Sequence, residues 1–242
     1  MGAQAPHPSR PQQGQLLEEF VPLLLGADQI GASKLVGRAI ELGWTIDDVR
    51  FDLITPALAE VGARWERGAI GVADEHLASS VCEWLLFNLA GRASREAATG
   101  RRAATGPRAI VGCSDGELHS LGARIVAHVL AEHGWTVLYL GAATPPAAWA
   151  QIVRSRRADV VVLCTTMPSL LARVRAALKE IKSARPDCRT VVGGQAYWGR
   201  PDAHDLLRPD LLALDARKLT EQVERLHRTT PARARPSDVP QT

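Results

Sequence analysis

The sequence predicts an α/β protein of two domains, in which an N-terminal four-helix bundle precedes a doubly wound, five-stranded parallel sheet. Two observations carry this prediction. Up to about residue 91 the apolar residues recur every three or four positions, and after about residue 108 short apolar runs alternate with helical stretches. A chain of 242 residues with 46% hydrophobic content is long enough to bury a core in each part.

The helical spacing separates the first part into four segments, and turn residues mark their ends. Gly43 ends the second segment, Thr45 with Asp47 and Asp48 begins the third, and Gly68 ends it. Short connections make neighbouring helices antiparallel, so we expect a bundle over residues 15–91. The apolar positions of the four segments are Leu16, Phe20, Leu23 and Leu24; Leu35, Val36, Ala39 and Ile40; Leu53, Ile54, Leu58, Val61 and Trp65; and Val72, Leu77, Val81 and Leu85.

Three further segments have the composition of connections and tails. Residues 92–107 combine glycine and arginine with no large apolar side chain, which is typical of an interdomain linker. Residues 1–14 and 229–242 are polar and rich in proline, and we expect both to be disordered.

The second part, residues 108–228, contains five candidate strands. The apolar runs cover residues 109–113, 136–140, 159–164, 189–192 and 210–214. Near-continuous apolar strands with helices between them predict a parallel sheet that is covered on both faces, as in flavodoxin-like and other Rossmann-like domains. In this architecture ligands bind at the carboxyl ends of the strands.

The composition excludes several classes of protein. The four cysteines form no CxxC pair, so neither a disulfide framework nor a zinc knuckle is expected. No stretch has the length and apolarity of a signal peptide or a membrane span, which favours a soluble, cytoplasmic protein. The net charge of +3 is mild, and solvated segments explain the clustered arginines at least as well as nucleic-acid contact does.

The loops that follow the strands contain small residues, which let a bulky ligand approach the backbone. Their sequences are SDGELHSLG, GAATPP, CTTMPS and GGQAYWG. The chain has neither GxGxxG nor GxxxxGK[ST], so the usual nucleotide cofactors are disfavoured.

One of these loops carries an ExHxxG pattern, formed by Glu117, His119 and Gly122. It resembles the DxHxxG signature of cobalamin-binding domains. In that family SxL follows after 41 residues and GG after a further 26 to 28. Here residues 123–163 precede Cys164-Thr165-Thr166, and residues 167–192 precede Gly193-Gly194. Cys164 and Thr166 depart from SxL, and this departure concerns the contacts to the nucleotide tail of the cofactor.

The pattern also has a physical rationale. A corrin ring supplies four nitrogens to cobalt, and His119 can fill the lower axial position while Glu117 accepts a hydrogen bond from its other ring nitrogen. The alternative is a surface histidine in a turn beside an acidic residue. The resemblance implies His119 as the cobalt ligand and the following residues as cofactor contacts: Asp115, Glu117, Leu118, Gly122, Cys164, Thr165, Thr166, Gly193 and Gly194.

A second motif lies in the helical part. WERGAIGVADEH, residues 65–76, resembles the Wx9EH motif of adenosylcobalamin-binding light receptors of the CarH type, whose helical bundle caps the upper face of the cofactor. The resemblance implies that Trp65, Val72, Glu75 and His76 contact the upper ligand. Alternatively, Trp65 belongs to the core, and Glu75 with His76 belongs to a solvated first turn of a helix.

The chain departs from these receptors in two ways. They begin with a helix-turn-helix DNA-binding domain, whereas only about 15 residues precede the first helix expected here, so direct DNA binding is not expected. In them a histidine that follows the motif tryptophan ligates cobalt after illumination. Glu66 stands at that position, which leaves His76 as the nearest substitute for a bis-histidine photoproduct.

Two classes of function remain open. The first is a sensor that binds adenosylcobalamin and is not an enzyme, in which a change of the upper ligand alters protein packing and the contact with a second copy or a separate regulatory protein. The second is a corrinoid methyl carrier that serves partner methyltransferases. Both leave the hard chemistry to the cofactor. A mutase subunit is a third option, but no barrel that would house a substrate is evident. The motif at residues 65–76 favours the sensor.

Overall fold

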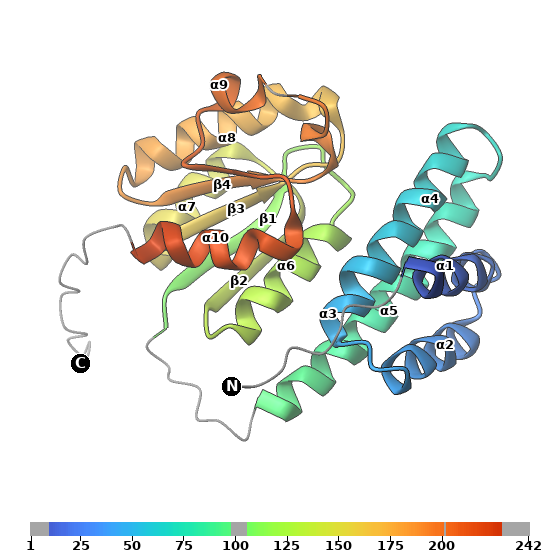
Figure 1. Ribbon diagram of the computed structural model, residues 1–242. Coiled ribbons are helices and arrows are strands. Elements are labelled where there is room, and N and C mark those ends of the chain that lie inside the picture. Colours follow the sequence, from blue (N-terminus) through green and yellow to red (C-terminus); the bar gives the residue numbers. More distant parts are fainter. Residues whose placement is uncertain (1–9, 98–105, 201, 229–242) are drawn as a thin grey trace.

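The computed structural model describes residues 10–97, 106–200 and 202–228, and it contains the predicted helical part and sheet part (Figure 1). The helical part comprises α1 (Arg10–Leu25), α2 (Gln29–Glu41), α3 (Ile46–Asp48), the π-helix η1 (Val49–Ile54), α4 (Thr55–Glu66) and α5 (Val72–Ala97). The sheet part comprises β1 (Arg108–Ser114), α6 (Leu121–Glu132), β2 (Thr136–Thr144), α7 (Pro146–Arg156), β3 (Val160–Cys164), η2 (Pro168–Leu170), α8 (Leu171–Ala184), β4 (Arg189–Gly193), η3 (Gln195–Tyr197), α9 (Ala203–Leu207), β5 (Leu211–Ala213) and α10 (Ala216–Arg228).

The predicted third helix is one continuous helical stretch, α3 to α4, with a π-helical turn in its middle. Thr45 and Asp48 form the capping box at its start, and Gly68 follows its end with φ +71°. The hydroxyl of Thr55 donates a hydrogen bond to the carbonyl oxygen of Arg50 at 2.8 Å within this stretch. The predicted four-helix bundle is confirmed, and its core includes the fully buried Phe20 and Leu86.

The five strands are all parallel and follow the order β2-β1-β3-β4-β5. This is the predicted flavodoxin-like order. Side chains of α7, α8 and α9 pack on one face of the sheet, and those of α6 and α10 pack on the other (Figure 1). The carboxyl ends of β1, β3 and β4 meet at one edge, where the register pairs Cys113 with Cys164 and Cys164 with Gly193.

The two parts meet along α6. Ile125 and Val129 of this helix belong to the apolar core of the bundle, and Arg124 at its start forms an ion pair with Glu83 of α5 at 2.8 Å. The bundle therefore contacts the sheet part through the helix that directly follows the His119 loop.

Several boundaries differ from the expected ones. α1 begins at Arg10 rather than at residue 15. α5 continues to Ala97, into the segment expected as a linker, because this segment contains alanine, arginine and glutamate and no helix-breaking proline. Residues 141–144, expected as a loop, extend β2. The predicted disordered residues 1–9 and 229–242, and residues 98–105 of the predicted linker, lie outside the described residues.

Two expectations drawn from composition can be compared with the structure. All four cysteines are buried free thiols, as expected without a disulfide framework. Within the described ranges, no helix combines the length and the apolarity that a membrane span requires.

Candidate functional site

The carboxylate of Glu117 is fully buried and joins the loop after β1 to the loop after β3. Its Oε1 accepts a hydrogen bond from the backbone N–H of His119 at 2.9 Å and lies 2.6 Å from Nδ1 of the same histidine. Its Oε2 accepts hydrogen bonds from the backbone N–H groups of Thr166 at 2.7 Å and Met167 at 3.1 Å. The glutamate and histidine of the ExHxxG pattern therefore form one hydrogen-bonded unit.

Burial and hydrogen bonding act in opposite directions on this pair. Burial alone would raise the pKa of Glu117, but hydrogen bonds from His119, Thr166 and Met167 bring it below its usual value. The hydrogen bond to Glu117 raises the pKa of His119 against the effect of burial, and the negative charges of Glu117 and Glu75 add to the increase. Glu117 is thus held as an acceptor for the Nδ1 proton of His119.

The other ring nitrogen of His119 remains for a ligand. The His119 side chain is 48% exposed, and no described residue hydrogen-bonds its Nε2. A histidine whose Nδ1 is fixed by a carboxylate presents Nε2 with a defined tautomer and direction, which is the usual arrangement of a metal-ligating histidine. These residues can therefore supply one axial ligand to a metal.

Large apolar side chains are exposed in the loops that follow three neighbouring strands. Leu118 follows β1, Met167 follows β3 and Trp198 follows β4, with exposures of 73%, 39% and 57%. Leu118 is among the contacts expected from the sequence, whereas Met167 and Trp198 are not. A large apolar residue in a loop of small residues is the sequence signal that identifies them. Exposed apolar surface at a strand end is suited to the face of a large planar ligand.

The remaining predicted contacts of this part take different positions. The carboxylate of Asp115 accepts a hydrogen bond from Arg173 at 2.7 Å. Thr165 is buried, and burial followed by the charge of Glu117 raises the pKa of the Cys164 thiol to about 12, so it stays neutral. The thiol that replaces the serine of SxL therefore offers a weak, uncharged partner.

The space around the three motif glycines differs from one position to the next. A Cβ atom on Gly122 would meet no atom within 4 Å, so the start of α6 borders open space. A Cβ atom on Gly194, which has φ +116°, would collide with the carbonyl oxygen of Thr165. A Cβ atom on Gly193 would lie 3.0 Å from the carbonyl oxygen of Ala213. Gly122 fits the predicted approach of a ligand, whereas local packing already requires Gly194.

The motif of the helical part flanks the turn between α4 and α5. Trp65 and Val72 are 45% and 55% exposed. Glu75 accepts a hydrogen bond from the hydroxyl of Ser79 at 2.6 Å, and Nε2 of His76 lies 3.6 Å from the Glu75 carboxylate. The charge of Glu75 contributes to the raised pKa of His119, which means that the start of α5 lies within electrostatic range of the candidate ligand. Of the four residues of the helical motif, Glu75 is the one with an electrostatic effect on His119.

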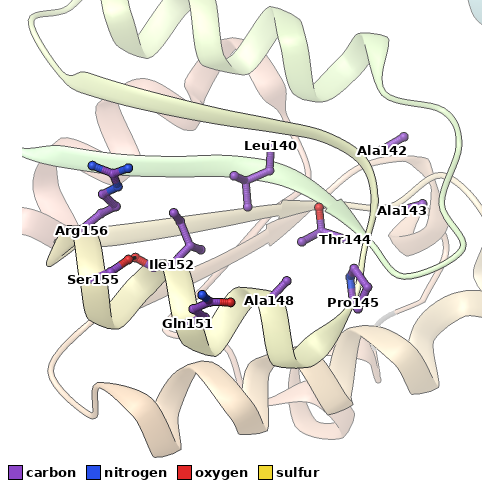
Figure 2. A pocket seen from close by; sticks show the side chains of 10 residues that line it. All are labelled: Leu140, Ala142, Ala143, Thr144, Pro145, Ala148, Gln151, Ile152, Ser155 and Arg156. Atoms are coloured by element: carbon purple, nitrogen blue, oxygen red, sulfur yellow. Dashed lines mark hydrogen bonds between the residues drawn. The ribbon is translucent and has the colours of Figure 1, made fainter.

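A hollow of about 590 Å³ lies along the edge strand β2 and helix α7 (Figure 2). Its lining residue Ala143 donates a backbone hydrogen bond to the carbonyl oxygen of Glu117 at 2.9 Å, so the hollow borders the loop after β1. It is formed by Leu140, Ala142, Ala143, Thr144, Pro145, Ala148, Gln151, Ile152, Ser155 and Arg156. None of the predicted site residues lines it. The candidate site is therefore defined by the fixed histidine and the exposed apolar side chains rather than by this hollow.

The site residues fit a corrinoid. His119 can supply one axial nitrogen, and the exposed Leu118, Met167 and Trp198 can contact a wide ring. At the end of β1, the hydroxyl of Ser114 is buried without a hydrogen-bond partner among the described residues, which is a feature of pockets that bind polar ligand groups. A corrin that brings four ligands of its own requires only a single histidine from the chain.

Comparisons with known proteins match both parts of the chain to one kind of domain. Two models that are both described as B12 binding domain match the chain, one over residues 107–215 and the other over residues 16–87. The HTH-type transcriptional repressor CarA of Myxococcus xanthus is 31% identical over 162 residues, which are 66% of this chain and 52% of CarA. The repressor CarH of the same organism is 30% identical over 146 residues, which are 60% of this chain and 46% of CarH. The chain spans about half the length of these curated relatives.

Among solved structures, the monomethylamine corrinoid protein of Methanosarcina barkeri superposes with a TM-score of 0.74 at 13% identity, over 88% of this chain and 99% of that one. This similarity concerns the fold, a helical part followed by a parallel sheet. The two matched domains, which together cover most of the chain, lead to one conclusion: the chain belongs to the family of B12 binding domain proteins.

Proposed function

We propose that this cobalamin-binding protein is a regulatory sensor that carries adenosylcobalamin, with His119 as the lower axial ligand of cobalt. The observation that carries the proposal is the buried Glu117 carboxylate, which fixes His119 through Nδ1 while the start of α5 lies within electrostatic range. A light-sensitive bond between cobalt and an adenosyl group would be the chemistry that the cofactor supplies. The chain supplies binding, orientation and a response.

On the lower side of the site, Glu117 holds the His119 imidazole in a fixed direction. One oxygen of Glu117 accepts hydrogen bonds from the backbone N–H and from Nδ1 of His119. Its second oxygen accepts hydrogen bonds from the backbone N–H groups of Thr166 and Met167. This network keeps the imidazole in one tautomer and increases its basicity as a ligand. Cys164, Thr165, Gly193 and the open space at Gly122 would border the part of the cofactor that enters the sheet domain.

The upper side is suited to sense what occupies the sixth cobalt position. In the proposed arrangement the indole of Trp65 packs against the adenosyl group, and the Glu75 carboxylate accepts hydrogen bonds from ribose or adenine. Val72 and His76 flank this contact. Loss of the adenosyl group would remove apolar contact from Trp65 and a donor from Glu75, and the bundle would then repack. The relatives CarA and CarH are transcriptional repressors, which supports a regulatory role.

The corrinoid methyl carrier remains the second candidate, and the partner distinguishes the two. A sensor acts through a second copy of the chain or a separate regulatory protein, whereas a carrier meets methyltransferases. The motif of Trp65 and Glu75, which resembles that of adenosylcobalamin-binding receptors, favours the sensor.

One experiment separates the two candidates. The purified protein is mixed in the dark with adenosylcobalamin, and its absorption spectrum and its mass by gel filtration are measured before and after green light. The sensor predicts a spectrum of histidine-ligated cobalt that changes on illumination, together with a changed assembly state. Tight binding of methylcobalamin without a light-dependent change in mass would instead support the carrier.

A further inference from the structure

The side chain of Arg50 is fully buried at the junction between the bundle and the sheet part. Its Nη1 donates hydrogen bonds to Asp47 at 3.0 Å and to Glu132 at 2.7 Å, and its Nη2 donates to the other Glu132 oxygen at 2.6 Å. Arg50 lies on η1 of the bundle, and Glu132 is the last residue of α6. The bidentate pair therefore joins the two matched domains at one point.

A second arginine contacts the same π-helix from the sheet side. Arg217 of α10 donates hydrogen bonds to Asp48 at 3.1 Å and to Asp52 at 2.6 Å, and its guanidinium lies 5.3 Å from the centre of the Phe51 ring. This arginine is partly exposed, unlike Arg50. Both arginines act on η1, so this short element is held from α6 and from α10 at once.

Arg50 is fully buried, whereas the Glu132 side chain is 25% exposed. In ion pairs that are largely withdrawn from water, the cost of desolvation offsets most of the attraction, so apolar replacements of similar volume are often neutral. A bidentate arginine–carboxylate pair nevertheless has one favoured geometry. The apolar contacts of Ile125 and Val129 already hold the bundle on α6, and the pair fixes the angle at which it sits.

This angle matters because both helices that leave the junction lead to the candidate site. α6 has 12 residues and begins at Leu121, two positions after His119. α4 also has 12 residues, starts directly after η1 and ends next to Trp65. Each is about 18 Å long, so a rotation of about 10° at the junction shifts the far end by about 3 Å. Such a shift is enough to remove a contact with an upper ligand while leaving His119 in place.

We propose that Arg50 and Glu132 are positioning residues that set the selectivity for the upper cobalt ligand, although neither touches the cofactor. This inference rests on the proposed function, because it assigns the upper face to the bundle and the lower face to the His119 loop. The pair aligns Trp65 and Glu75 with the adenosyl group by fixing the bundle on α6.

The test replaces the pair by apolar residues and measures selectivity. Full-length Arg50→Met/Glu132→Leu is titrated in the dark with adenosylcobalamin and with hydroxocobalamin, and both dissociation constants are taken from absorption. We expect the affinity for adenosylcobalamin to fall about tenfold relative to hydroxocobalamin, a coupling typical of separate sites. The spectrum of histidine-ligated cobalt is expected to stay unchanged. Arg38→Ala serves as the matched control. It removes an exposed ion pair with Glu19 between α1 and α2, and it is expected to keep the wild-type ratio of the two dissociation constants.

Glu132→Gln is measured in parallel, in case the double variant does not fold. It removes the charge of the side chain and keeps its volume. It is expected to shift the same ratio in the same direction. An unchanged ratio, or equal losses of both corrinoids, in a folded variant overturns the inference. Wild-type protein that binds neither corrinoid contradicts the proposed function itself, so the two failures are distinguishable.

Discussion

The two sides of the candidate site differ in how far they are built before a ligand binds. On the lower side, four hydrogen bonds from His119, Thr166 and Met167 hold the buried carboxylate of Glu117. On the upper side, Trp65 and Val72 expose 45% and 55% of their surfaces. The side chain proposed as the lower ligand is pre-organised by the fold, whereas two of the side chains proposed as upper contacts are exposed. This difference is what we expect of the proposed sensor, which would respond to the loss of its upper ligand.

The largest effect is expected where the lower side loses its ligand. His119→Ala should weaken cobalamin binding about 100-fold and abolish the spectrum of histidine-ligated cobalt, because no described neighbour of this residue can replace it. Absorption titration with hydroxocobalamin measures both quantities. Unchanged affinity and spectrum would contradict the assignment of His119.

Removing the carboxylate that holds His119 should have an intermediate effect. Each carboxylate oxygen of Glu117 accepts two hydrogen bonds. In Glu117→Gln the NH2 group replaces one of these oxygens and cannot accept, so the donors on that side lose their acceptor. We expect the free energy of unfolding to fall by about 1–3 kcal/mol and the cobalamin affinity to fall about tenfold. Urea unfolding and absorption titration test these two expectations. A variant with wild-type stability would show that the buried carboxylate is not needed by the two loops.

A change on the upper side should act on one form of the cofactor alone. Trp65→Ala should leave the affinity for hydroxocobalamin within about twofold of the wild type. The binding of adenosylcobalamin should weaken by roughly 1–3 kcal/mol, which is the range for an aromatic side chain stacked on a base. Parallel titrations in the dark measure the difference. Equal losses for both forms would show that Trp65 serves the bundle core.

The smallest expected effect concerns the junction and depends on pH. Burial would raise the pKa of Asp48, but hydrogen bonds from Thr45 and the nearby Arg217 bring it below its usual value. A carboxylate with a lowered pKa stabilises the fold above its ordinary pKa of about 4, and this contribution is lost as the pH falls further. Asp48→Asn should therefore lose less stability than the wild type between about pH 5 and about pH 3, by under about 1 kcal/mol. Urea midpoints at both values check this, and identical losses would contradict it.

Much of the architecture follows from local patterns. The strands are short apolar runs bounded by small residues, and the capping box of Thr45 and Asp48 marks a helix start, so both could be predicted. The carboxyl ends of parallel strands meet, which placed Glu117 and His119 beside the loops after β3 and β4. The pairing of Glu117 with His119 was expected from the spacing of the motif.

Other features depend on contacts between distant segments. The partner of Arg50 is 82 positions away in the sequence, and nothing local distinguishes this arginine from the exposed ones around it. The π-helix interrupts a stretch whose spacing predicts an ordinary helix. Oε2 of Glu117 binds backbone amides of Thr166 and Met167, which carry no side-chain signature. Met167 and Trp198 stand out in the sequence as large apolar residues among small ones, but the exposure of their side chains is known only from the folded loops.

The most direct test of the account examines the atom that binds cobalt. Protein labelled with nitrogen-15 histidine is loaded with cobalamin, reduced to the cobalt(II) form and studied by electron paramagnetic resonance, in parallel with His119→Ala. The account predicts a splitting from a single nitrogen-15 nucleus in the wild type that is absent in the variant. A splitting from nitrogen-14 of the cofactor's own base, unaffected by the label, would contradict it.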